Sequence, residues 1–291
     1  MVTLQDIKDA RVRLDGIIHK TPFALAPNLS AICNKEIYIK KENLQLTGSF
    51  KLRGAFNKIA LLSQEQKNAG VVASSAGNHA QGVAFAAKHF GIEATIFMPE
   101  TTPLTKVSGV KALGAEVVLK GSKYDEAYAY AKEYATNLNK TFVHPYADDE
   151  VIAGQGTIAL EVLEQIEDID TFVVPIGGGG LISGIAIAAK AINPNIKVIG
   201  VVASGARAMK ESYEAKTAID SIDVKTIADG IAVRDITPKM LDLVLEYIDE
   251  VVEVEDKEIA NAILFLVEKQ KLVVEGAGAA GIAAVMHGKV T

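Results

Sequence analysis

The sequence of 291 residues contains a single cysteine, Cys33, and has no excess of basic side chains. One cysteine excludes an internal disulfide framework and any CxxC metal or redox motif, which is typical of proteins from a reducing cytoplasm. The 30 basic residues and 36 acidic residues give a net charge of −6. Because no basic tail or cluster is present either, neither a nucleic acid nor an acidic membrane surface is expected as a partner.

The chain also has little that resembles a membrane or export segment. One uncharged stretch, residues 171–189, is long enough on paper to cross a bilayer. Pro175 and four successive glycines, residues 177–180, interrupt it, which disfavours a spanning helix and favours a strand, a tight loop and a helix. The N-terminus is charged from Asp6 onward and is not typical of a secretory signal. We therefore expect a cytoplasmic protein with no membrane partner.

Short apolar segments alternate with amphipathic ones along most of the chain. The pattern predicts strands at residues 36–41, 71–73, 94–98, 116–119, 172–174 and 198–202, and helices at 4–14, 78–90, 104–113, 124–138, 181–192, 258–271 and 277–286. This alternation is typical of parallel sheets that helices bury on both faces. Two such sets of elements indicate two α/β lobes, and a ligand site is expected between such lobes.

The first candidate site is a run of glycines, VVPIGGGGLISG, at residues 173–184. Consecutive glycines let backbone amides approach an anion, and a helix N-terminus adds partial positive charge, so a phosphate-bearing ligand fits. Neither the GxGxxG spacing nor a GK[ST] ending is present, which excludes the usual nucleotide motifs. A tight strand-to-helix turn with no ligand explains the same glycines.

The second candidate site is a lysine in LTGSFKLRGAFNK, residues 46–58. Lys51 lies beside the apolar Phe50, where the pattern indicates that a helix begins. Partial desolvation and the positive end of a helix both lower the pKa of a lysine toward that of a nucleophilic amine. The alternative is an ordinary solvated lysine on the surface.

The third candidate site is SSAGNHAQG, residues 74–82, between a predicted strand and a predicted helix. Its small residues leave the loop amides accessible, and Asn78 offers a neutral amide to a phenolate-type oxygen. The alternative is a helix cap in which Asn78 or Ser75 satisfies the first-turn amides. The two interpretations are compatible with each other.

Taken in order, these motifs resemble those of pyridoxal-phosphate (PLP) enzymes of the tryptophan synthase β fold type, specifically the threonine/serine dehydratases (threonine ammonia-lyases). The resemblance extends from about residue 16 to the end and includes KKENLQLTGSFKLRGA, SSAGNHAQGVA, VHPYADDEVIAGQGT, PIGGGGLISG, IADGIAV and VEGAGAAG. It implies an α/β, two-lobed fold type II protein in which each lobe is a mostly parallel sheet flanked by helices. Residues 1–62 and 148–291 would form the large PLP-binding domain, and residues 63–147 the small substrate-loop domain.

The resemblance also implies a role for each site residue. Lys51 would hold PLP as a Schiff base and accept the substrate proton, Phe50 would pack on the ring, and Asn78 would bond its 3′-oxygen. The residues implied for the phosphate are Gly177, Gly178, Gly179, Gly180 and Leu181. Gly230 and Glu275 would line the same pocket. The residues implied for the substrate carboxylate are Ser75, Ala76, Gly77, Asn78 and His79.

The implied reaction converts threonine or serine, a small amino-acid substrate, to 2-oxobutanoate or pyruvate plus ammonia, in a homodimer or homotetramer. Serine racemases of the family have a serine where this chain has Ala76, so we expect no acid on the opposite face and expect elimination to dominate. Cysteine synthases end their lysine motif in Lys-Asp-Arg, whereas this chain has Lys51-Leu52-Arg53, which argues against β-replacement.

Two further departures from the family bear on cofactors. Eukaryotic-type relatives bind a divalent cation with an acidic pair at positions that correspond to Val202 and Ala208, so no metal ion is predicted. After residues 287–289 the family has a strand that brings a serine or cysteine to the pyridine nitrogen, and the sequence stops at Thr291 before it. The alternatives that stay open are a serine racemase or β-replacement enzyme, and a truncated, catalytically weak protein that binds PLP or an amino acid.

Overall fold

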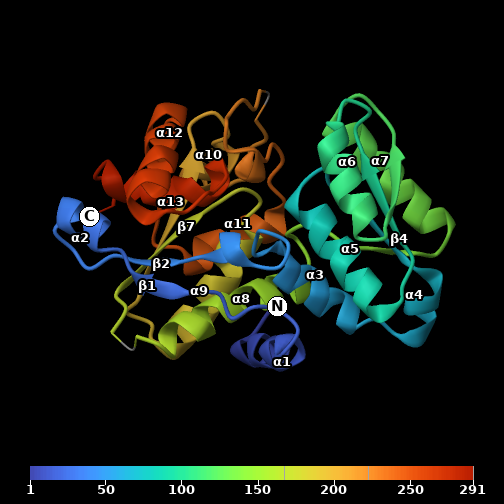
Figure 1. The fold of residues 1–291 in the computed structure, drawn as a ribbon, viewed down its shortest axis with the longest axis horizontal. Coiled ribbons are helices and arrows are strands. Elements are labelled where there is room, and N and C mark those ends of the chain that lie inside the picture. Colours follow the sequence, from blue (N-terminus) through green and yellow to red (C-terminus); the bar gives the residue numbers. More distant parts are fainter. Residues whose placement is uncertain (167, 222, 291) are drawn as a thin grey trace. The chain divides into compact units, whose positions relative to one another are not determined.

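A computed structural model describes residues 1–166, 168–221 and 223–290, and the chain divides into two compact units (Figure 1). Unit 1 contains Met1–His19 and Leu44–Gln155, and unit 2 contains Lys20–Asn43 and Gly156–Thr291. Each unit is a part of the chain whose residues pack mainly against one another. The domains expected from the sequence have other boundaries, at residues 62 and 147, and were defined by the role of each part. That division stays a prediction.

The centre of unit 1 is a parallel sheet with the strand order β5-β4-β3-β6. Its strands are β3 (Val71–Ser74), β4 (Ala94–Met98), β5 (Glu116–Leu119) and β6 (Thr141–Phe142). In this register Val71 lies opposite Ala94 on one side and Thr141 on the other. Strands β3 and β4 are buried along their whole length, as expected where helices cover both faces of a sheet.

Helices cover the two faces of this sheet according to the alternation of side chains along each strand. Val71 and Ala73 share a core cluster with α3 (Lys51–Ala60) and α5 (Asn78–Phe90), whereas the intervening Val72 packs with α7 (Tyr124–Asn137). The other helices that begin in unit 1 are α1 (Leu4–Leu14), α4 (Gln64–Ala69), α6 (Leu104–Ala112) and α8 (Asp149–Leu163).

Unit 2 contains a second parallel sheet, β7-β8-β9. Its strands are β7 (Thr171–Pro175), β8 (Lys197–Ala203) and β9 (Glu250–Val254). One face packs against α12 (Asp256–Phe265) and α13 (Gly276–Met286), and the other approaches α9 (Gly180–Ile192) at Gly200. The remaining elements are the antiparallel pair β1 (Phe23–Leu25) and β2 (Tyr38–Lys40), η1 (Glu42–Leu44), α2 (Pro27–Cys33), α10 (Ala208–Ala215), η2 (Asp229–Ile231), α11 (Pro238–Tyr247) and the π-helical turn η3 (Leu266–Gln270).

The α/β class predicted from the sequence is confirmed, and most predicted elements lie within one or two residues of the observed ones. The predicted helix at residues 258–271 is instead two elements, because α12 ends at Phe265 and a π-helical turn follows. Helix α8 was not predicted. Its residues 151–162 are buried on every side, so the sequence lacks the polar face that makes a helix recognisable.

Helix α3 lies so close to its neighbours in unit 1 that backbone meets backbone. A Cβ atom on Gly82 of α5 would lie 3.2 Å from the Cα atom of Leu52. A Cβ atom on Gly154 of α8 would lie 2.6 Å both from the carbonyl oxygen of Arg53 and from the Cα atom of Gly54. These glycines are therefore required by the close approach of the helices, and they fix the position of α3.

We expect Gly154→Ala to lower the free energy of unfolding by about 1–3 kcal/mol, as overpacking of a core does. Gly109 of α6 provides the control, since a Cβ atom there meets nothing within 4 Å. Alanine at this helical position is expected to stabilise the protein by up to about 1 kcal/mol. Urea unfolding of both variants checks this, and equal effects at the two positions would contradict it.

Candidate active site

Lys51 is the first residue of α3, and its side chain is half-buried. Its Nζ donates a hydrogen bond to the carbonyl oxygen of Pro145 at 3.0 Å and lies 5.3 Å from the centroid of the Phe50 ring. The residue before the helix, Phe50, provides no capping side chain. The amine is thus held by a carbonyl and an aromatic ring at the positive end of a helix, and it is not a freely solvated surface group.

The predicted carboxylate loop follows β3 and leads into α5. The Ser75 amide donates to the Phe97 carbonyl at 3.1 Å, and Ser75 Oγ accepts from the Gly77 amide at 3.2 Å. Gly77 is the N-cap of α5, and no side chain caps this helix. The N-cap residue itself is therefore not the serine or asparagine that the sequence offered as an alternative, and a helix that begins at a glycine has an N-terminus suited to an anion.

The structure brings this loop and the lysine together within unit 1. Gly82, in the second turn of α5, lies against the start of α3, where its Cβ atom would be 3.2 Å from the backbone of Lys51 and Leu52. The two motifs at residues 46–58 and 74–82 are thus joined by direct helix contact. The roles predicted for Ser75, Ala76, Gly77 and Asn78 as carboxylate ligands stay predictions.

His79 belongs to the same loop motif, but its side chain is buried in unit 1 with 3% exposure. Its Nε2 lies 2.8 Å from the carbonyl oxygen of Val143. Because a carbonyl only accepts, Nε2 carries the proton, and Nδ1 has no partner in the described chain. Burial, and then the charge of Lys51, lower the pKa of His79 to about 3, so the ring is neutral at pH 7. Any contact of this residue with a carboxylate therefore comes from its backbone amide.

The glycine run of unit 2 connects β7 to α9. Gly179 is the N-cap of α9 with a φ of 91°, a left-handed conformation that favours glycine, and no side chain caps the helix. A Cβ atom on Gly177 would lie 3.0 Å from Val233 Cγ2. The hydroxyl of Ser183, in the first turn of α9, is buried and has no partner in the part of the chain that the structure describes. Uncapped amides, glycine backbone and an unsatisfied hydroxyl together suit a phosphate group.

Gly230 and Glu275 lie beside this glycine run in unit 2. A Cβ atom on Gly177 would be 3.1 Å from the Cα atom of Ile231, the residue after Gly230. A Cβ atom on Gly230 would be 3.1 Å from Glu275 Oε1. The structure thus brings together the three unit 2 segments that the sequence singled out, whereas their contact with a cofactor stays a prediction. The predicted site residues of unit 1 form a separate group, described above.

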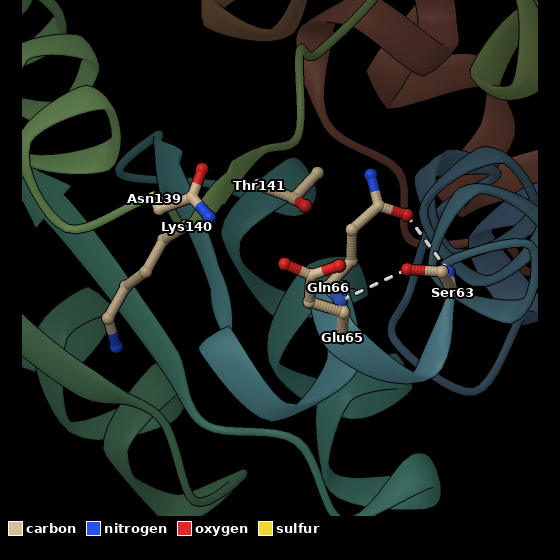
Figure 2. A pocket seen from close by; sticks show the side chains of 6 residues that line it. All are labelled: Ser63, Glu65, Gln66, Asn139, Lys140 and Thr141. Atoms are coloured by element: carbon tan, nitrogen blue, oxygen red, sulfur yellow. Dashed lines mark hydrogen bonds between the residues drawn. The ribbon is translucent and has the colours of Figure 1, made fainter.

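A polar hollow of 640 Å³ lies elsewhere in unit 1 (Figure 2). Its lining consists of Ser63, Glu65, Gln66, Asn139, Lys140 and Thr141. Figure 2 shows the reciprocal hydrogen bonds between Ser63 and Gln66, which form the capping box of α4. Lys140 forms an ion pair with Glu93 at 2.9 Å. None of the predicted site residues lines this hollow, and helix capping and the ion pair account for Ser63, Gln66 and Lys140.

The comparisons with known proteins decide the family. A model for pyridoxal-phosphate-dependent enzymes matches residues 14–290. The chain belongs to this PLP-dependent enzyme family. An L-threonine ammonia-lyase of Thermotoga maritima is 52% identical over 287 residues, which are 99% of this chain and 72% of that protein.

Solved structures of the PLP-dependent family share the fold. Maize serine racemase superposes with a TM-score of 0.95 and 38% identity, over 98% of this chain and 86% of that one. The processed form of threonine deaminase isoform 2 from Solanum lycopersicum gives a TM-score of 0.94 and 39% identity, over 99% and 85%. The predicted PLP cofactor and the two-lobed fold type II are confirmed.

The described residues were searched for a membrane-spanning helix and for a metal-ion site. No helix among them is both long and apolar enough to cross a membrane, and the uncharged stretch at 171–189 instead forms β7, the glycine run and most of α9. The described residues also contain no group of three or more His, Cys, Asp or Glu side chains that could hold a metal ion.

Sequence reasoning missed three groups of this PLP-dependent enzyme. The Pro145 carbonyl holds the Lys51 amine, but a backbone oxygen leaves no side-chain signal. Gly82 lies in the predicted loop motif at residues 74–82, whereas in the structure it lets α5 approach α3. His144 accepts hydrogen bonds from two backbone amides next to Pro145, and these bonds depend on the conformation of the turn, which the sequence does not reveal.

The low pKa of His79 predicts a specific loss of stability in mild acid. The folded-state pKa of about 3 lies below the unfolded value of 6.5, so the unfolded chain binds the extra proton and stability falls as the pH decreases below 6.5. The slope contributed by this residue approaches about 1.4 kcal/mol per pH unit. Urea unfolding between pH 7.5 and 5 measures it.

His79→Gln is the matched control, because glutamine retains an N–H donor near the position of Nε2 but does not titrate. The variant is expected to lose less stability than the parent protein over the same pH interval. Parallel pH profiles for the two proteins would show that His79 titrates normally in the folded state.

Proposed function

We propose that the protein catalyses the PLP-dependent elimination of threonine to 2-oxobutanoate and ammonia, and of serine to pyruvate and ammonia. The observation that carries the proposal is the placement of Lys51. Its amine is held at 3.0 Å by the Pro145 carbonyl, and its backbone lies against Gly82 of α5, in a chain 52% identical to an L-threonine ammonia-lyase. A small amino acid is the substrate that such a lysine and a single carboxylate site would serve.

We assign the cofactor contacts to the residues that fit them. Lys51 would bond the aldehyde carbon covalently, Phe50 would lie on the ring, Asn78 would bond the 3′-oxygen, and the amides of residues 177–181 would hold the phosphate. Gly230 and Glu275 would line the same pocket. When bound, PLP supplies a conjugated ring that takes up the electron pair left by removal of the substrate Cα proton.

The protein contributes orientation and proton handling. Backbone amides at residues 75–79 would hold the substrate carboxylate, because the start of α5 has no side-chain cap. With the substrate bound at the cofactor, the Lys51 amine would accept the Cα proton. A neutral His79 behind the loop neither competes for that proton nor adds a second positive charge. The Cα proton and the hydroxyl group would leave together as one water molecule, and hydrolysis by one water molecule would then give the 2-oxo acid and ammonia.

The covalent role of Lys51 has a direct test. Borohydride reduction of the holoenzyme followed by peptide mapping is expected to find the pyridoxyl group on Lys51, and a label on Lys40 or Lys41 would overturn the assignment. Lys51→Ala is expected to fold and to lose turnover by about 10²- to 10⁴-fold or more, since it removes the proton acceptor. Lys8→Ala, on the exposed face of α1, is the control and should retain full activity.

A serine racemase is the second candidate, because maize serine racemase has the same fold at 38% identity. Proton return to the opposite face needs a group within about 3 Å of the carbon, and Ala76 provides none. We therefore expect L-serine to give pyruvate with negligible D-serine. Ala76→Ser should raise the D-serine yield relative to pyruvate. If the parent protein already makes both at comparable rates, another acid is present and the interpretation of Ala76 is wrong.

We further propose that the protein acts in the cytoplasm as a homodimer or homotetramer, and that residues 63–147 move as one lobe on substrate binding. The single cysteine supports the compartment. Sedimentation of the holoenzyme tests the oligomeric state. Small-angle scattering with and without a substrate analogue tests the movement, and identical profiles would count against it.

A further inference from the structure

The Lys51 amine is held by a backbone carbonyl, so whatever directs that carbonyl also positions the amine. The carbonyl belongs to Pro145, in the segment that follows β6. At the start of this segment the Val143 amide donates to the Val72 carbonyl of β3 at 2.8 Å. The Val143 carbonyl accepts from His79 Nε2, also at 2.8 Å. The segment is therefore tied to the sheet and to α5 before it reaches the lysine.

The segment is tied at its far end as well. Asp148 Oδ1 accepts from the amides of Glu150 at 3.0 Å and Val151 at 3.3 Å, so Asp148 caps α8. The other oxygen, Oδ2, pairs with Lys58 Nζ at 3.0 Å. Residues 144–147 lie between the two anchors, and their conformation decides where the carbonyl that holds the lysine amine points.

One side chain within these residues closes a turn. His144 Nδ1 accepts hydrogen bonds from the amides of Tyr146 at 3.2 Å and Ala147 at 2.9 Å. An acceptor that bonds amides two and three residues ahead acts as Asn and Asp do in local turns. Pro145 lies inside this turn, and its ring fixes φ, so the closed turn gives its carbonyl one direction.

We propose that His144 is a positioning residue for Lys51: it closes the turn through two amides and thereby directs the Pro145 carbonyl at the lysine amine. The catalytic role of Lys51 rests on the proposed function. The contacts of His144 and Pro145 are observed in the structure and do not depend on that function. The acceptor atom Nδ1 carries no proton in this arrangement, so the proton of the neutral ring lies on Nε2.

His144 also packs in an aromatic cluster, and a packing role has to be separated from the acceptor role. Its ring centroid lies 4.6 Å from that of Tyr146, 6.0 Å from that of Tyr128 and 6.3 Å from that of Phe142. His144→Phe retains an aromatic ring without the acceptor. His144→Asn retains an acceptor oxygen near the position of Nδ1 without the ring. If His144 acts by packing, only His144→Asn is impaired. If it acts as a hydrogen-bond acceptor, only His144→Phe is impaired.

The test measures the reactivity of Lys51 in the full chain without cofactor. Trace acetylation at pH 8, quantified by mass spectrometry, gives the labelling rate of Lys51 relative to the exposed Lys8 of α1. A hydrogen bond donated to a carbonyl favours the ammonium form of a lysine, and this form reacts slowly because it has no lone pair for acylation. We expect at least a threefold faster relative rate in His144→Phe (an order-of-magnitude expectation for loss of one hydrogen bond) and a parental rate in His144→Asn.

Activity of the holoenzyme gives the second readout. His144→Phe is expected to lower kcat about 10- to 100-fold, as misplacement of a reacting group does, with KM little changed because the carboxylate loop keeps its bond to Val143. His144→Asn should retain most of kcat. A parental labelling rate in His144→Phe, or a raised rate in His144→Asn, would overturn the proposal.

The result does not depend on any single variant or on the reaction. If His144→Phe does not fold, His144→Asn still decides, because a packing role predicts that it is impaired and an acceptor role predicts that it is not. If the parent protein shows no elimination with threonine or serine, the proposed function fails, while the labelling rates still test the positioning of Lys51.

Discussion

The close contact of α3 with α5 and α8 is the constraint on which the rest of unit 1 depends. At Gly82 and at Gly154 the helices meet through backbone atoms, with no side chain between them to adjust. Such an interface tolerates one separation and one rotation, because packed interiors have no spare volume. Lys51 is the first residue of α3 and Asn78 the first of α5, so this contact also fixes the distance between the two helix starts.

Buried polar side chains also hold α3 in place. Arg53 and Asn57 of α3 are buried at 0% and 1% exposure, which is costly unless each finds partners. Asn57 accepts from Arg13 of α1 at 2.5 Å and donates to the Glu150 carbonyl of α8 at 2.7 Å. One side chain thus joins three helices, and these directional bonds add to the backbone contact in holding α3.

The same local device occurs at the start of α5 and at the start of α9. Each helix has a glycine as N-cap, Gly77 and Gly179, and neither has a capping side chain. A serine or aspartate at these positions would satisfy the first-turn amides and fill the space in front of them. Leaving them uncapped has a cost in helix stability, and the natural compensation is an external anion. A carboxylate and a phosphate are the anions that the family's chemistry requires.

The sequence could predict what depends on periodicity or on familiar motifs, and little of what depends on backbone contact. Helix α5 and strand β4 were predicted at their observed limits, because their apolar residues repeat at helical or strand spacing. Helix α8 escaped because it is buried all round, and the Pro145 carbonyl because a backbone oxygen has no sequence signature. Contacts between distant backbone atoms leave no pattern except an isolated glycine, which a turn explains equally well.

The neutral state of His79 depends both on the packing of the helices and on the charge of a neighbouring side chain. Its ring is buried by the packing that the α3–α5 contact imposes, and burial disfavours the imidazolium. The positive charge of Lys51 acts in the same direction. The Val143 and Pro145 carbonyls accept from the two side chains in turn, so a single segment of backbone orders both the histidine behind the loop and the lysine in front of it.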